Sequence, residues 1–190
     1  MDFILKDKYL SLKKIKNIYT TSINYDQKGE KNIMFFKIVQ NKLLWAISQQ
    51  TAAELIYRRV DANLPLMGMV AYDKEKTTYL RKADVNTAKN YLKEDEIKLL
   101  GLLVEQYLAF AETMAQQKIP MYMKDWIERL DSILQLNGRE LLTHAGKISN
   151  EMAQKKLEKE YEKYIEYQKN IEKEASLKQL EDDLKSLKLN

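Results

Sequence analysis

Carboxylates close to basic side chains are the residues of this chain best suited to chemistry. The first group consists of Gln50, Thr51, Glu54, Arg58 and Asp61, which recur at helical spacing. A positioned carboxylate can serve as a general acid or base. Thr51 and Glu54 also have the spacing of a capping box, and Glu54 can pair with Arg58 for about 0.3 to 0.5 kcal/mol if exposed. We favour the structural interpretation of this group and keep the catalytic one open.

A second group, with the same combination of charges, contains Asp125, Trp126, Arg129 and Asp131. Asp125 lies one helical turn before Arg129, so the two can form an ion pair. A tryptophan among charged residues is more often a core anchor than a platform for ligand stacking. Carboxylates from the two groups would act as acid and base only if they faced each other in a dry cleft.

The remaining candidates carry weaker indications of chemistry. Lys89 and Asn90 would suit a phosphate, but no glycine-rich loop accompanies them, so a P-loop is excluded and a solvated helix face is favoured. The chain has no cysteine and a single histidine, His144. This composition excludes thiolate nucleophiles and zinc ribbons and favours a structural or surface role for the imidazole. We expect neither a cofactor nor a metal.

The elements that must position these residues are predicted to be mainly helices. Of the 190 residues 45% are apolar and 32% charged, with only five Gly and two Pro. We therefore expect a mainly α, multi-helix bundle, with a helical core domain over residues 1–146. Apolar periodicity and capping residues predict helices near residues 3–21, 35–47, 52–60, 84–92, 94–117 and 122–137. One small β-hairpin is predicted near residues 67–80, from Met67–Tyr72 and Thr77–Leu80.

Residues 147–190 are predicted to form a long charged C-terminal helix or tail that packs partly on the core. Apolar residues follow one narrow seam from Leu157 to Ala175, and a second seam begins at Leu177. Ser176 and Gln179 would cap a separate short helix after the change of seam. A dimer through this tail is an open alternative, although two short seams fall below the three or four heptads of a coiled coil.

The charge distribution gives only weak support to direct contact with nucleic acid. The net charge is +4, and the pI of 8.9 lies just below the value of about 9 that is typical of nucleic-acid-binding domains. Apolar stretches are too short for a signal peptide or a membrane span. We therefore expect a cytoplasmic protein without a membrane role.

Several specific sequence runs resemble the virulence-associated RhuM family over most of residues 9 to 167. They are Gln50-Thr51-Ala52-Ala53-Glu54, Arg59-Val60-Asp61-Ala62, Ala88-Lys89-Asn90-Tyr91-Leu92, Lys124-Asp125-Trp126-Ile127-Glu128-Arg129-Leu130-Asp131 and Ala145-Gly146-Lys147-Ile148-Ser149. The resemblance implies an origin on a mobile element, such as a prophage or pathogenicity island. Members of the family typically carry an N-terminal region that resembles a DNA-binding module. We expect this chain to correspond to the effector half without that module.

Two main functions follow as hypotheses, and a third, a transcriptional cofactor, would fit best if a partner chain carries the N-terminal module. The preferred one is a non-enzymatic interaction or effector protein of mobile-element origin that binds a host protein or ribonucleoprotein complex. A concrete version inhibits an RNA-guided (CRISPR) defence nuclease. The alternative is an enzyme that acts on nucleic acid or a nucleotide through clustered carboxylates. The enzyme requires Glu54, Asp61, Lys89 and Asp125 to converge in one pocket, whereas a binding protein allows them to spread over a surface.

Overall fold

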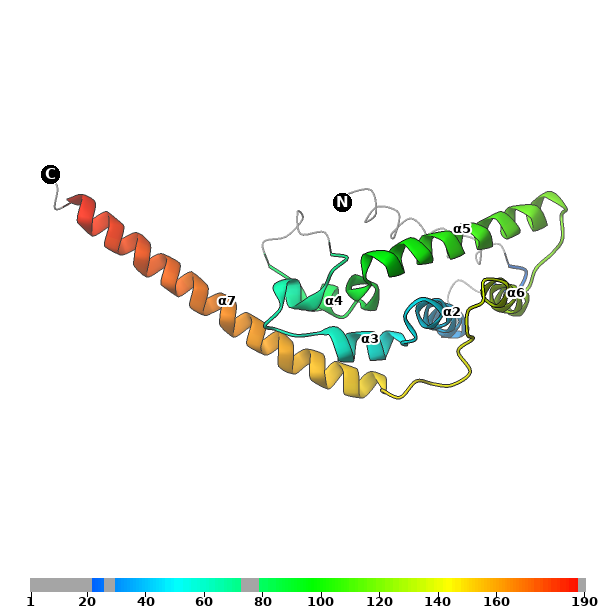
Figure 1. The fold of residues 1–190 in the computed structure, drawn as a ribbon, viewed down its shortest axis with the longest axis horizontal. Helices are drawn as coiled ribbons and strands as arrows, with labels where there is room; N and C mark the ends of the chain where they lie inside the picture. Colours follow the sequence, from blue (N-terminus) through cyan, green and yellow to red (C-terminus); the bar gives the residue numbers. More distant parts are fainter. Residues whose placement is uncertain (1–21, 26–29, 73–78, 188–190) are drawn as a thin grey trace.

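The computed structural model describes residues 22–25, 30–72 and 79–187 (Figure 1). Its elements in chain order are α2 (Glu30–Ser48), α3 (Ala52–Arg59), the 3-10 helix η1 (Pro65–Gly68), α4 (Lys82–Val85), the 3-10 helix η3 (Ala88–Tyr91), α5 (Glu94–Gln116), α6 (Met123–Leu136) and α7 (Asn150–Leu187). The prediction of a mainly helical fold is confirmed. The helix predicted near residues 3–21 lies outside the described residues.

The hydrophobic core forms where α2 meets α3, α5 and α6. Figure 1 shows α5 running across α2 and α6, which are both seen nearly end-on. Of the apolar positions that predicted α2, Phe35, Val39, Leu43 and Leu44 are buried, and Phe36 and Ile47 are partly buried against the core. Tyr107 on α5 is buried and donates its hydroxyl hydrogen to the carbonyl of Trp126 on α6, at 2.8 Å. The helical periodicity of the sequence therefore identified the faces that pack together.

Helix α3 begins with the predicted capping box, and the box is confirmed. The Glu54 side chain is only 2% exposed. Its Oε2 accepts from the Thr51 amide at 2.8 Å, and its Oε1 accepts from the Lys147 amide at 2.8 Å. The loop before α7 packs so closely here that a Cβ on Gly146 would lie 2.9 Å from Thr51 Cγ2. One buried carboxylate thus joins the start of α3 to the loop that leads into α7.

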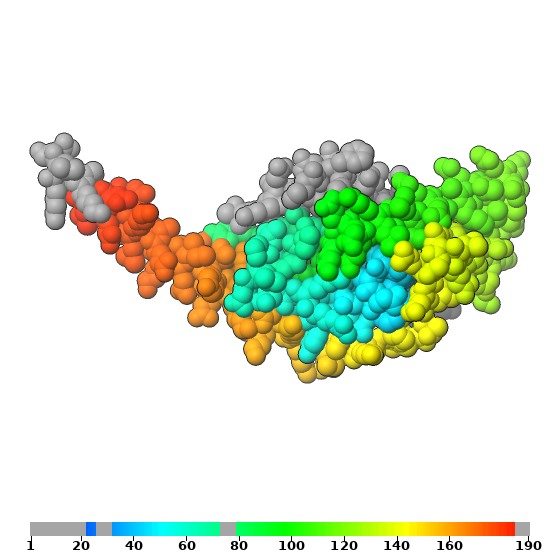
Figure 2. Space-filling model, in the orientation of Figure 1, coloured from blue at the N-terminus to red at the C-terminus, as the bar shows by residue number. Residues whose placement is uncertain are grey.

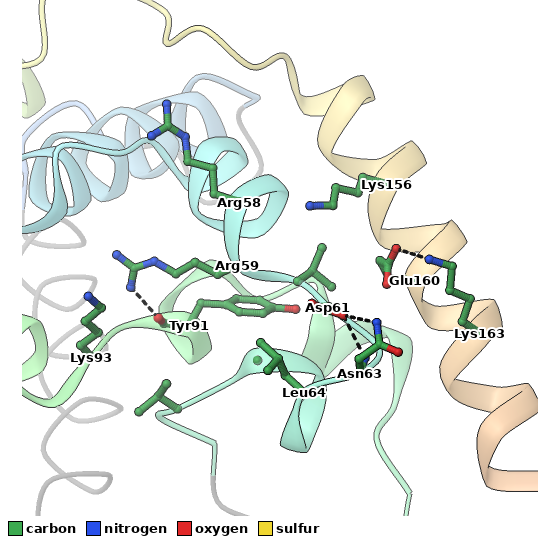
Figure 3. Close-up of a pocket in the computed structure, with 13 residues that line it drawn as sticks. Arg58, Arg59, Asp61, Asn63, Leu64, Tyr91, Lys93, Lys156, Glu160 and Lys163 are labelled. Carbon is green, nitrogen blue, oxygen red and sulfur yellow. Dashed lines mark hydrogen bonds and ion pairs between the residues drawn. The ribbon is translucent and has the colours of Figure 1, made fainter.

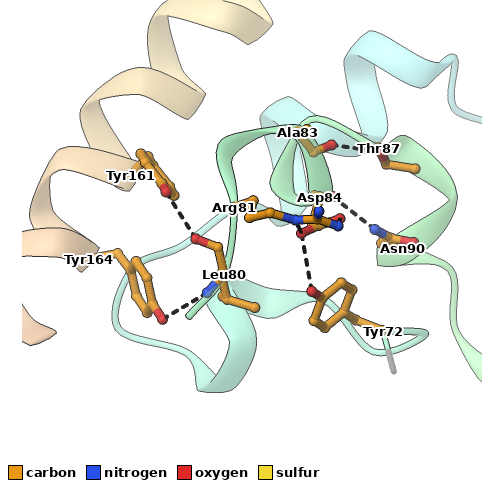
Figure 4. Close-up of polar contacts among 9 residues, drawn as sticks. All are labelled: Tyr72, Leu80, Arg81, Ala83, Asp84, Thr87, Asn90, Tyr161 and Tyr164. Atoms are coloured by element: carbon orange, nitrogen blue, oxygen red, sulfur yellow. Dashed lines mark hydrogen bonds and ion pairs between the residues drawn. The ribbon is translucent and has the colours of Figure 1, made fainter. Parts of the chain in front are cut away.

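The β-hairpin predicted near residues 67–80 is not supported, because residues 67–72, 79 and 80 form no strand and residues 73–78 lie outside the described part of the chain. Met67 belongs to η1, and the Ala71 amide donates to the Asn90 carbonyl of η3 at 2.9 Å. Leu80 is held from α7, where the Tyr161 hydroxyl donates to its carbonyl at 2.9 Å and the Tyr164 hydroxyl accepts from its amide at 3.5 Å (Figure 4). These backbone groups find partners in η3 and α7 instead of in each other.

The single helix predicted near residues 84–92 is also wrong, since α4 and η3 are separate short helices. The Asn90 side chain donates to the Asp84 carbonyl, and the Tyr91 hydroxyl donates to the Val85 carbonyl, each at 2.8 Å. Figure 4 shows Asn90 directed back toward Asp84. Side chains of the second half therefore bind carbonyls of the first, which closes a compact turn where a straight helix was expected.

Helix α7 contains 38 residues and is about 57 Å long. It is continuous through Ser176, so the predicted break there is wrong. Ala153 and Leu157 are fully buried, whereas every residue from 169 to 184 is exposed, and Figure 2 shows this second half standing clear of the core. At about 100° per residue, Leu177, Leu180 and Leu184 lie roughly opposite the seam that packs on the core.

None of the helices in the described ranges has the length and apolar character needed to span a membrane.

Replacing Glu54 with Ala should lower the free energy of unfolding by about 2 to 4 kcal/mol, because the buried Thr51 amide and the partly buried Lys147 amide would lose their acceptor. Urea unfolding followed by far-UV circular dichroism measures this change. Glu151→Ala, which removes an exposed ion pair with Lys155, is the matched control and should barely move the midpoint. Equal effects of the two substitutions would contradict the assigned role of Glu54.

Candidate functional site

A cleft of about 540 Å³ opens between the end of α3, η1 and α7. We call it the basic cleft, because five cationic side chains and two carboxylates occur among its described lining residues (Figure 3). The lining residues are Arg58, Arg59, Val60, Asp61, Asn63, Leu64, Gly68, Val70, Tyr91, Lys93, Lys156, Glu160 and Lys163. The excess of positive charge favours an anionic ligand.

Arg59, the last residue of α3, is held rigidly at the floor of the basic cleft. Its Nη1 and Nη2 donate to Oε2 and Oε1 of Glu96 at 2.7 and 2.6 Å, and Nη1 also donates to the Tyr91 carbonyl at 2.7 Å. Such two-point pairing fixes the guanidinium plane. Glu96 accepts in addition from the Lys93 amide at 2.7 Å. The same carboxylate therefore orients Arg59 and starts α5 beside it.

The Glu96 carboxylate remains charged at neutral pH despite its burial. Burial alone would raise its pKa, but the hydrogen bonds from Arg59 and Lys93 and the charge of Arg59 lower the pKa below its ordinary value. These stabilising contacts outweigh the desolvation. Arg59 is consequently occupied by an internal partner and serves as a fixed part of the floor.

The wall on α7 carries Lys156, Glu160 and Lys163. Glu160 accepts from the Ala62 amide at 3.0 Å and from Lys163 Nζ at 2.7 Å, and these contacts lower its pKa. Lys156 Nζ donates to the Tyr57 carbonyl at 2.6 Å and lies 5.0 Å from the centre of that ring. This wall therefore ties α7 to α3 and to the turn that follows α3.

Two cations of the basic cleft remain available to a ligand. Arg58 and Lys93 are exposed, and neither head group forms an ion pair with another described residue. Figure 3 shows them on either side of Arg59. Asp61 forms no ion pair with either of them in the described part of the chain, and its Oδ1 accepts from the amide and the side chain of Asn63, both at 2.9 Å. Those two hydrogen bonds also lower the pKa of Asp61.

Only Arg58 and Asp61 of the first sequence-predicted group line the basic cleft. Thr51 and Glu54 form the buried cap of α3. The Gln50 side-chain oxygen is buried without a hydrogen-bond partner among the described residues. These five residues share one stretch of chain, but the structure does not bring them into one cavity.

The group on Lys89 and Asn90 lies on η3, outside the lining of the basic cleft. Asn90 is buried and bound to the Asp84 carbonyl. Burial lowers the pKa of Lys89.

The single histidine, His144, accepts a hydrogen bond from the Gly146 amide at 3.0 Å and meets the Trp45 ring edge to face.

The group on α6 fastens that helix to its neighbours and also lies outside the basic cleft. Asp125 accepts from the Tyr122 amide at 2.8 Å, and Asp131 pairs with Lys42 of α2 at 2.7 Å. The remaining two members pack on aromatic rings of α5: Trp126 is 3% exposed and meets Tyr107 and Phe110 edge to face, and Arg129 lies 5.7 Å from the centre of Phe110.

Sequence reasoning missed most of the residues that line the basic cleft. Arg59 was part of a family-like run but was not chosen as a candidate, and Lys93 was not singled out. Lys156, Glu160 and Lys163 recur at i, i+4 and i+7, which places them on one face of a helix. That spacing was the available indication, and it was hidden within a tail in which charged residues are dense.

The carboxylates proposed as acids and bases have structural partners instead of a shared cavity. Glu54 and Asp125 each stand at the third position of a helix and accept a hydrogen bond from the amide of the residue just before that helix. Glu96, which was not one of those candidates, does the same at the start of α5. Within the described ranges, no group of three or more His, Cys, Asp or Glu side chains is arranged to hold a metal ion.

The fold and site define a helical protein with a basic cleft beside a projecting helix. The chain belongs to the Virulence protein RhuM family, whose model matches residues 6–173. It is thus a virulence-associated protein by family, as its sequence runs predicted. No curated protein and no solved structure matches it.

Replacing Gly68 with Ala should destabilise the protein by about 2 kcal/mol or more, because the residue adopts a positive φ and its Cβ would meet backbone. The φ is +82°, and the added Cβ would lie 2.2 Å from the Arg59 carbonyl oxygen. Gly101→Ala is the matched control, since nothing lies within 4 Å of that position inside α5. It should stabilise by about 0.5 to 1 kcal/mol. Chemical unfolding measures the change in the free energy of unfolding for each variant, and the two changes should have opposite signs. No change on Gly68→Ala would contradict the tight turn.

Acid should weaken the fold through Glu96 and Glu54, whose pKa values are lowered from 4.5. Their stabilising contribution is complete above the ordinary value and is lost as the pH falls through the lower folded-state pKa, because the unfolded chain binds more protons there. The free energy of unfolding should therefore fall from pH 4.5 downward. Glu96→Gln should flatten this dependence in urea titrations at several pH values. An unchanged slope would show that Glu96 does not contribute.

Proposed function

We propose that this protein is a non-enzymatic effector of mobile-element origin that binds a host macromolecular complex through the basic cleft. The observation that carries the proposal is the pair of exposed cations, Arg58 and Lys93, which form no ion pair with another described residue and lie on either side of the fixed Arg59. Exposed cations on a rigid frame attract phosphates without reorganising it. Family membership adds the association with virulence.

The placement of the carboxylates favours binding over catalysis. The alternative, an enzyme acting on nucleic acid or a nucleotide, needs several carboxylates in one cavity. Asp61 and Glu160 are the two in the basic cleft, and each accepts hydrogen bonds from the protein itself. Neither has the arrangement of an acid paired with a base.

The concrete form of the proposal is an inhibitor of an RNA-guided defence nuclease. Such a nuclease is a ribonucleoprotein, and its RNA presents closely spaced phosphates that match a row of cations. Docking of the basic cleft on this RNA would place the protein, with its projecting α7, across the path of the substrate. Binding would then depend on salt, because each phosphate contact releases counterions.

The decisive variant is the double charge reversal Arg58→Glu with Lys93→Glu. Binding to a panel of purified RNA-guided nuclease complexes, and inhibition of DNA cleavage by each, should weaken about tenfold or more. The affinity of the double variant should also depend less steeply on salt, with the slope of log K against log salt reduced by about 1.4 for two contacts to single-stranded RNA. Fluorescence anisotropy with labelled complexes measures the affinity and its salt dependence.

The matched control is Lys98→Glu with Lys155→Glu, which makes the same charge change at exposed positions outside the basic cleft. It should retain binding and inhibition. The proposal fails if the unaltered protein neither binds nor inhibits any complex of the panel. It also fails if the two double variants behave alike.

A further inference from the structure

A second cavity, of about 890 Å³, lies where α2, α3, the turn between α4 and η3, and the start of α7 meet. Its lining includes five side-chain amides, and Lys37 is its one charged residue among those described. We call it the amide groove, after Gln40, Asn41, Asn86, Asn150 and Gln154. Its volume falls within the range of ligand sites, which is about 300 to 1,000 Å³. None of its described lining residues also lines the basic cleft.

Part of this amide wall is fixed in orientation by internal hydrogen bonds. Asn41 Oδ1 accepts from the Ala52 amide at 2.9 Å, and Gln154 Nε2 donates to Asn86 Oδ1 at 2.5 Å. Each of these amides keeps its other polar atom for a ligand. The side chains of Gln40 and Asn150 make no hydrogen bond with the described residues. The groove therefore offers both donors and acceptors on a partly fixed wall.

We propose that the amide groove binds an extended peptide segment of a partner protein through its main chain. Every residue of an extended chain except proline carries one N–H donor and one C=O acceptor, and an Asn or Gln amide can satisfy both. Between the amides the groove is lined by small and aliphatic side chains such as Ala53, Ala88 and Ile148. Such a lining accommodates the side chains of the peptide with little selectivity for their shape.

The composition of the groove favours a peptide over the other ligands that amides can recognise. Single-stranded RNA is held by stacking of its bases on aromatic rings, and none of the described residues that line this cavity is aromatic. One lysine is also too little charge for a run of phosphates. Lys37 has no carboxylate beside it among the described lining residues. We therefore expect a preference for peptides with an acidic residue at the end of the groove where Lys37 lies.

The test uses the full chain, immobilised and offered to a phage-displayed library of random peptides, with enriched sequences resynthesised and measured by fluorescence polarisation. We expect micromolar binders that are enriched in acidic residues. Gln40→Ala and Asn150→Ala should each weaken binding about fivefold or more, through loss of hydrogen bonds to the peptide main chain. Gln135→Ala, an exposed amide on α6 outside the groove, is the matched control and should change nothing.

A charge reversal separates recognition from simple loss of folding. Lys37→Glu should shift the enriched peptides from acidic to basic, an outcome that a misfolded protein would not give. The inference is overturned if no peptide is enriched over selection on an unrelated protein, or if the Gln40 and Asn150 variants bind as the unaltered chain does. The inference is also overturned if oligoadenylate or oligouridylate RNA of about ten nucleotides displaces the peptide and the Gln40→Ala variant no longer allows this displacement. That outcome would show that the groove binds nucleobases. The Arg58 and Lys93 double variant should keep peptide binding, so failure of the basic cleft and failure of the groove are distinguishable.

Discussion

The buried carboxylate of Glu54 fixes where the loop before α7 meets α3, and the basic cleft and the amide groove both depend on this junction. One oxygen closes the cap of α3 through the Thr51 amide, and the other accepts from Lys147. A charged group removed from water is tolerated only when its hydrogen-bonding capacity is filled. Because α7 starts from this anchor and then runs along α3, its residues form one wall of the basic cleft and one end of the amide groove.

The same device recurs at two other helices, with different additional partners. Glu96 starts α5 and also binds Arg59 across the floor of the basic cleft, while Asp125 starts α6. A carboxylate near a helix N-terminus is stabilised by the free amides and by the helix dipole. This chain therefore uses acidic residues as structural joints. From the sequence alone, two of them, Glu54 and Asp125, resemble candidates for acid and base catalysis.

Local patterns predicted the helices well, because helical periodicity and caps are properties of neighbouring residues. The Thr51–Glu54 box and the stop of α6 at Gly138, with φ of +66°, are examples. The predicted hairpin failed because the partners of Leu80 lie on α7, more than eighty residues away. The basic cleft was missed for the same reason, since the bond between Arg59 and Glu96 joins residues that no local spacing connects.

The division of α7 into a packed half and a solvent half has a consequence for how the helix forms. Starting a helix is unfavourable because several backbone dihedrals are fixed for the first hydrogen bond, whereas extending it is nearly neutral. The buried residues Ala153 and Leu157 order the first turns through tertiary contacts. The solvent-exposed half then only has to extend a helix that has already started. Its helicity is thus inherited from the core, and the same residues released as an isolated peptide would be largely unstructured.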